Sequence, residues 1–145
     1  MKKLSILVIL ILLGTGCASV APTTVSPVQA YKNAMQKWST LCSSDMDDLA
    51  ILFNTFAMTS SWQADVLNTL TITESDCMTM RSYSNTPVEF IPVQKEIDLG
   101  LADYSAAFSY IRSGVTNWDN DALVNGMTYM KNGIQHINNA NALNH

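Results

Sequence analysis

Charged side chains are scarce in this chain. They make up 14 % of its 145 residues, against about 25 % in an average protein. Basic residues are the scarcer kind, since eight lysines and arginines stand against twelve aspartates and glutamates, for a formal net charge of −4. Binding to nucleic acid or to anionic lipid headgroups needs a basic patch. The composition therefore argues against nucleic acid as a partner and against electrostatic docking on a membrane.

Residues that carry catalysis are also few. The histidines are His136 and His145, and the glutamates are Glu74, Glu89 and Glu96. The sequence holds no motif of a metalloprotease, a serine hydrolase, a phosphate-binding loop or a haem attachment site. The glutamates also lack the spacing of a glycosidase pair or a di-iron bundle. We therefore predict no catalytic residues, no metal ligands and no cofactor, and an enzyme is the least favoured functional class.

Glycine and proline are absent from the 59 residues between Pro27 and Pro87. Strand-rich domains are interrupted by turns roughly every 8–12 residues, so this stretch favours helices. Ser26-Pro27 opens the first helix as its N-cap and first residue. The aspartates within residues 45–48 suit a fresh helix start, so a break near residue 44 is an alternative. Apolar residues recur in steps of three and four, at Val28, Tyr31, Met35, Trp38, Cys42, Met46, Leu49, Phe53 and Phe56.

Three further helices are predicted after the first. The second begins with a cap at Ser60-Ser61, the third follows Pro92 and stops at Gly114, and the fourth is capped by Asn117 or Asp119. Their predicted inward positions are Trp62, Val66, Leu70, Cys77 and Met80, then Val93, Ile97, Leu101, Tyr104, Phe108 and Ile111, then Leu123, Met127, Met130, Ile134 and Ile137. The predicted fold is all-α, an antiparallel four-helix bundle made of a long helical hairpin and two further helices.

Two cysteines lie within this predicted bundle, Cys42 and Cys77. If the first two helices fold back near residues 59–61, residues whose numbers sum to about 119 lie level, as these two do. A level, inward-facing pair oxidises outside the cytoplasm. A redox-active pair is the rival reading, but it needs a cationic neighbour or a CxxC turn, and the sequence shows neither. We predict a structural disulfide between Cys42 and Cys77.

The first residues have the pattern of an export signal. Lys2 and Lys3 precede an apolar run over residues 4–13, about half of the ~20 residues that cross a bilayer as a helix. Small residues at 14–16 then lead to Cys17, which resembles the lipobox of bacterial lipoproteins, although that motif usually has an aliphatic residue where Gly14 stands. The resemblance implies that Cys17 is acylated. The alternative is an ordinary secretory signal with an incidental cysteine.

This reading divides the chain into three parts. Residues 1–16 form a cleaved lipoprotein signal, residues 17–26 the lipidated cysteine and its tether, and residues 27–145 the bundle domain. A palmitate or similar chain on Cys17 then attaches the protein to the lipid bilayer at the extracytoplasmic face of the cell membrane. The predicted function is a binding or structural module of the cell envelope, with an envelope protein or a small ligand as partner.

Three features of the bundle bear on that partner. Met78-Thr79-Met80 and Met127-x-x-Met130 offer thioethers to Cu(I), which keeps a copper-binding or small-ligand-binding bundle as the alternative function, although methionine is also common core filler. A stripe of small residues at 122, 126, 133 and 140 suits close packing on the alanines of the third helix, or else a ligand groove. Connections often carry function, so Tyr83 and Phe90 near the proline connection are the predicted partner surface.

The order of these features resembles a diffuse group of uncharacterised small helical bacterial lipoproteins. The resemblance rests on the tryptophan that opens the second helix, the proline connection, and the small residues of the last two helices. The positions that carry it are Trp62, Pro87, Tyr104-x-x-Ala107, Gly114-Val115, Asp119, Gly126, Gly133 and Ala140. It implies the fold and the location, and it brings no activity with it.

Overall fold

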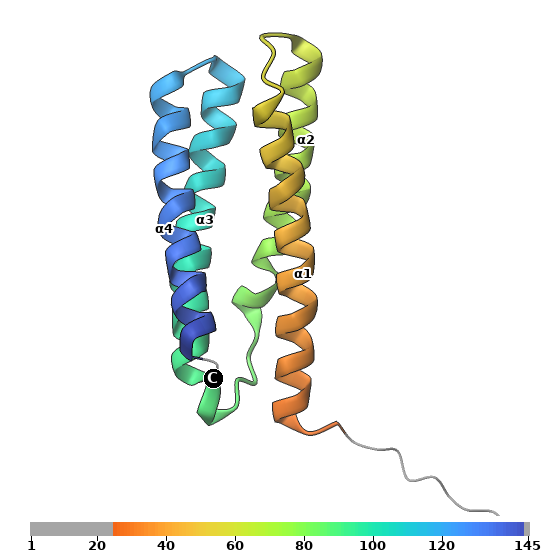
Figure 1. Cartoon of the computed structure of the whole chain (residues 1–145), viewed down its shortest axis with the longest axis vertical. Coiled ribbons are helices and arrows are strands. Elements are labelled where there is room, and N and C mark those ends of the chain that lie inside the picture. Colours follow the sequence, from red (N-terminus) through yellow and green to blue (C-terminus); the bar gives the residue numbers. More distant parts are fainter. Residues whose placement is uncertain (1–24, 144–145) are drawn as a thin grey trace, which may run out of the picture.

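The computed structural model describes residues 25–143 as an antiparallel four-helix bundle (Figure 1). This confirms the all-α fold. The helices are α1 (Pro27–Asn54), α2 (Ser60–Cys77), α3 (Ile91–Asn117) and α4 (Asn120–Leu143), and two short 3-10 turns, η1 (Met78–Ser82) and η2 (Val88–Phe90), lie in the connection between α2 and α3. The predictions for the export signal and for Cys17 fall on residues outside this described part.

Helix α1 is continuous from Pro27 to Asn54, so the chain does not break near residue 44. The Ser26 hydroxyl accepts a hydrogen bond from the Gln29 amide at 3.2 Å, which satisfies one of the free N–H groups of the first turn. The cap of α2 lies one residue earlier than predicted. The Thr59 hydroxyl, rather than Ser60 or Ser61, accepts the Trp62 amide hydrogen bond.

The turn between α3 and α4 differs from the prediction at Gly114. Helix α3 continues past this glycine to Asn117, and Trp118 takes the left-handed conformation that ends it, with φ 55°. Glycine is required at position 114 inside the helix because α4 comes so close there that a Cβ would lie 2.7 Å from side-chain carbons of Leu123. The Asp119 carboxylate accepts the amides of residues 121 and 122, so Asp119 is the cap of α4.

The helices pack in chain order, α1 on α2, α2 on α3 and α3 on α4. Figure 1 shows the α1–α2 hairpin beside the α3–α4 hairpin, with both tight turns at one end of the bundle. The start of α1 and the end of α4 lie at the other end. Within the described chain no Cα atom of α1 comes within 8 Å of a Cα atom of α4, so the bundle has an open seam between its first and last helices.

The core confirms the inward positions predicted for α2 and α3, all of which are buried. The prediction for α4 is correct only in part. Leu123, Met130 and Ile137 are partly buried and pack on the core, and the stripe of small residues packs closely on α3, which is the first of the two roles considered for it. The buried residues of α4 are Ala122, Gly126, Gly133 and Ala140, whereas Met127 is 69 % exposed and Ile134 is 48 % exposed. Small side chains let the backbones of α3 and α4 approach, so α4 turns this face inward and its larger apolar face toward the open seam.

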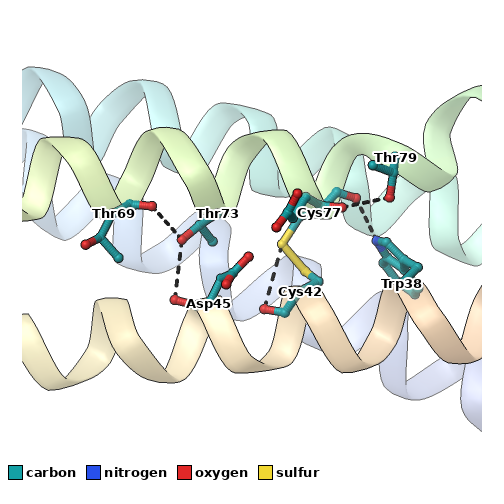
Figure 2. The surroundings of a disulfide bond; sticks show 8 residues. Trp38, Cys42, Asp45, Thr69, Thr73, Cys77 and Thr79 are labelled. Carbon is teal, nitrogen blue, oxygen red and sulfur yellow. Dashed lines mark hydrogen bonds between the residues drawn. A yellow bond between two sulfur atoms is a disulfide. The ribbon is translucent and has the colours of Figure 1, made fainter.

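A disulfide joins Cys42 of α1 to Cys77 of α2, as predicted, with their Cα atoms 4.7 Å apart (Figure 2). Around it, the Trp38 indole donates a hydrogen bond to the Cys77 carbonyl at 2.7 Å. One turn away, the Thr73 hydroxyl shares its proton between the Thr69 carbonyl of its own helix at 2.9 Å and the Asp45 carbonyl of α1 at 3.3 Å. These bonds hold α1 and α2 level, in the register that the two cysteines indicate.

No helix in the described part of the chain is long and apolar enough to cross a membrane.

Candidate functional site

The open seam between α1 and α4 forms a groove of about 1300 Å³. One face of α1 and the turn after it make one wall, over residues 38–56, and one face of α4 makes the other, over residues 120–141. Tyr104 and Ile111 of α3 form the floor. The groove therefore follows most of the length of both helices and is built from three of the four helices.

The walls of the groove are mainly apolar. On α4 they include the heptad-spaced residues that were predicted to lie in the core, Leu123, Met127, Met130, Ile134 and Ile137. On α1 the wall includes Met46, Leu49 and Phe53. Several of these residues are half-buried and pack on the edge of the core. A contiguous apolar surface of this length is typical of a binding site in a soluble domain.

The floor contains a polar group without a protein partner. The Tyr104 side chain belongs to a residue that is 6 % exposed, and its hydroxyl makes no hydrogen bond with any residue that the structure describes. Burial raises the pKa of Tyr104 to about 12, so the hydroxyl keeps its proton at neutral pH and remains a hydrogen-bond donor. The hydroxyl oxygen is not among the fully buried polar atoms, so water can reach it from the groove, and a ligand that covers it has to supply a hydrogen-bond acceptor in place of that water.

Aromatic rings close one end of the groove. Phe53 of α1 and Phe56 of the α1–α2 turn contact Trp62 of α2 edge to face, with ring centroids 5.9 Å and 4.7 Å from that of the tryptophan. Trp62 also stacks on Trp118 of the α3–α4 turn at 6.0 Å. This cluster joins the two hairpins. It also explains why a tryptophan holds the left-handed position, because the stacking offsets a strain of about 1–2 kcal/mol.

The rims of the groove carry one charge of each sign. Asp47 lies on the α1 rim and Lys131 on the α4 rim, and both are exposed. Neither forms an ion pair with another described residue. Both charges are therefore free to meet groups of a bound partner.

Tyr83 and Phe90, the predicted partner surface, do not form an exposed pair. Phe90 is 8 % exposed and stacks on the buried Tyr31 ring at 4.9 Å, and Tyr83 meets Tyr31 edge to face at 5.2 Å. The Tyr31 hydroxyl donates to the Gln94 side chain at 2.9 Å. The aromatic rings of the connection thus pack against α1, which leaves too little of Phe90 exposed for a docking surface.

The two methionine motifs proposed for Cu(I) are not brought together. Met80 is buried in the core beside the α2–α3 connection, whereas Met127 and Met130 line the groove on α4. No Cα atom of the Met78–Ser82 turn lies within 8 Å of one in α4. The described residues also contain no cluster of three histidines, cysteines or acids that could hold a metal ion.

One polar cluster was missed in the sequence. His136 of α4 lies between two acids of α3, with its Nδ1 2.8 Å from a Glu96 oxygen and its Nε2 3.8 Å from an Asp103 oxygen. The hydrogen bonds from His136 and then Asn139 lower the pKa of Glu96. The seven-residue spacing of the two acids was the available signal. These residues do not line the groove, and the cluster joins the outer faces of α3 and α4.

No family model, no curated protein and no solved structure matches this chain.

Proposed function

We propose that this chain is a lipid-anchored protein of the cell envelope that acts as a binding module, with the α1–α4 groove as its binding site. The observation that carries the binding site is the apolar groove with the unpartnered Tyr104 hydroxyl in its floor. Apolar walls supply affinity through surface removed from water, and a single polar group in the floor orients the ligand.

The anchor rests on the sequence pattern that ends at Cys17. Nine residues separate Cys17 from Pro27, the first residue of α1. Such a tether spans at most ~30 Å, which keeps the domain close to the bilayer. The start of α1 lies at the end of the bundle opposite the two tight turns, so the groove extends away from the tether.

An enzyme is less well supported by the same geometry. The polar groups of the groove are spread along its length, with Asp47 and Lys131 on opposite rims. General acid-base or nucleophilic catalysis needs groups that converge on one point. A groove for a small apolar ligand remains the second candidate, because the apolar walls favour it as well.

The anchor is tested by intact mass spectrometry of the chain purified from membranes. We expect the wild-type protein to begin at Cys17 and to carry the mass of acyl chains, and we expect the Cys17→Ser variant to lack that mass. A wild-type chain that is cleaved elsewhere or carries no lipid contradicts the anchor. The binding site is tested separately.

The groove is tested with a small aromatic diazirine as an apolar photoprobe, on the chain in lipid nanodiscs. We expect the label on peptides that cover the groove-lining residues of α1 and α4. Ile134→Glu places a charge in the groove, and Ile72→Glu is the matched control, because the two isoleucines are 48 % and 49 % exposed and Ile72 lies on α2 outside the groove. The first variant should lose most of this label and the second should keep it. Label spread evenly over exposed apolar residues contradicts the site.

A further inference from the structure

We infer that the occupant of the α1–α4 groove is an amphipathic α-helix of a partner protein, with one polar residue in the middle of its apolar face. This inference rests on the proposed binding function and specifies the class of ligand. The groove lies where a fifth helix would complete the packing of α1 and α4.

The dimensions of the groove fit a helix. The lining of α4 runs from Asn120 to Asn141, which is about 32 Å at 1.5 Å per residue. A helix is about 10–12 Å wide with its side chains, so a helix sunk to half its width over this length displaces roughly 1300–1800 Å³. The groove holds about 1300 Å³. A single acyl chain is much thinner than a helix, so it would leave most of the groove filled with water.

The spacing of the wall residues is that of a helix-packing face. On α4 the residues from Leu123 to Ile137 follow in steps of four, three, four and three. Such a seam presents side chains that fit between those of a facing helix. Helix α3 uses only part of this seam, since Leu123 and Ile137 pack on its glycines. Met127 and Ile134 remain exposed between them, and α1 lies too far away to cover them. Three methionines in the walls, Met46, Met127 and Met130, can adapt to the side chains of a partner helix.

The Tyr104 hydroxyl sets the chemistry at the middle of the partner. It is a protonated donor in an apolar floor, so a bound apolar face needs an acceptor at that level. A single asparagine or glutamine within the partner's apolar stripe supplies one. One buried polar residue of this kind also fixes the register of packed helices.

The rims set the charge of the partner's flanks. With Asp47 on the α1 rim and Lys131 on the α4 rim, a partner helix is favoured when its α1-facing flank is basic and its α4-facing flank is acidic. A second copy of this chain fits less well. It presents the same concave groove, and two grooves face to face leave both floors unfilled.

The probe for this inference is a fluorescein-labelled peptide of three heptads, with leucine at the core positions, asparagine at the central one, lysine on one flank and glutamate on the other. Its binding to the purified full chain in lipid nanodiscs is followed by anisotropy, with a scrambled peptide of the same composition as control. We expect Ile134→Glu to weaken binding at least tenfold and Ile72→Glu to leave it unchanged. The scrambled peptide should not bind.

Two further variants test the chemistry of the floor and the rim. Tyr104→Phe should weaken binding of the peptide with a central asparagine about threefold to tenfold. The same variant should bind a peptide with leucine at the central position more tightly than the wild type does. Lys131→Glu makes both rims acidic. It should therefore weaken binding of the peptide that has lysine on one flank and glutamate on the other, and it should strengthen binding of a peptide that has lysine on both flanks. If Tyr104→Phe changes the binding of the asparagine peptide and of the leucine peptide equally, the assigned contact between the hydroxyl and the central residue is wrong.

Other occupants give distinct results. If palmitate competes with the photoprobe in the groove and the helical peptides do not, the groove binds acyl chains and the helix inference falls while the proposed function stands. A dimer in sedimentation that Ile134→Glu dissolves would assign the groove to a second copy, which also overturns the inference. If neither peptide nor palmitate competes and Ile134→Glu does not change the photolabel, the inference and the proposed binding site both fall.

Discussion

The ring of Tyr104 packs on the bare face of Gly133, so closely that a methyl group added to that glycine would overlap the ring. Tyr104 also lies in the floor of the groove. One contact therefore serves two purposes. It lets α3 and α4 approach, and it holds the tyrosine where its hydroxyl can meet a ligand.

The first prediction concerns this packing. Gly133→Ala should destabilise the fold by about 1–3 kcal/mol in denaturant unfolding, because the added methyl must displace the Tyr104 ring or separate the helices. Gly126→Ala should act alike, since its Cβ would lie 2.7 Å from an Ile111 side-chain carbon. The control is the exposed neighbour Asn132→Ala, which should be neutral or slightly stabilising through helix propensity. Wild-type stability in both glycine variants would contradict close packing at these sites.

Apolar periodicity and the spacing of the cysteines predict different parts of this fold, because each reports on a different property of the chain. Apolar periodicity located four helices and the inward faces of α2 and α3, and the level cysteines gave the register of α1 and α2. On α4 periodicity was only partly right, because it ranks side chains by apolar size and so placed the exposed Met127 and Ile134 in the core. The contact with α3 is decided by backbone approach, which glycine and alanine permit. Gly114 was misplaced for the same reason, since it serves helix packing rather than a helix end.

The groove could not be predicted from local patterns. It exists because α1 and α4 stay apart, and their separation is set by the packing of each on α2 and α3. The apolar stripe predicted on α4 nevertheless contains residues that line one groove wall. The floor residue Tyr104 was identified as buried, but no sequence signal shows that its hydroxyl would lack a partner.

The second prediction concerns the disulfide. Cys42 and Cys77 are 35 residues apart, and closing a loop of this length stabilises the fold by about 3–4 kcal/mol on the chain-entropy model. Reduction should therefore lower the melting temperature while the far-ultraviolet circular dichroism at 25 °C stays helical. The double variant Cys42→Ala, Cys77→Ala is the control, and its melting temperature should not respond to reductant. Free thiols at both positions in the untreated protein would refute the bond.

The third prediction separates the core from the groove wall. Phe108 is fully buried, so Phe108→Ala should cost about 3–5 kcal/mol as a cavity-forming change. Phe53 is only half-buried at the groove, so Phe53→Ala should cost below about 2 kcal/mol. It should instead reduce photoprobe labelling of the groove. Equal destabilisation by the two changes, measured by urea unfolding, would show that Phe53 is a core residue.

The last prediction concerns the effect of pH on two neighbouring acids beside the disulfide, Asp45 of α1 and Asp76 of α2. One oxygen of Asp45, Oδ2, is buried, and as a carboxylate it meets no hydrogen-bond donor among the described residues. This burial, followed by the hydrogen bond and charge of the Asp76 carboxyl and by the charge of Asp48, raises the pKa of Asp45. A proton on either carboxyl of the pair supplies the missing donor.

The sign of the pH effect follows from the raised pKa. Between the ordinary value of about 3.9 and the raised value, the folded state holds more protons than the unfolded state, so the contribution of Asp45 to stability falls as the pH rises. Asp45→Asn removes this loss, because its amide can donate to Asp76 at any pH. Its melting temperature should match the wild type near pH 3 and exceed it at pH 7. Asp65→Asn, an exposed change on α2, should show no such divergence. An equal gain at both pH values would mean that ionisation of Asp45 is not the cause.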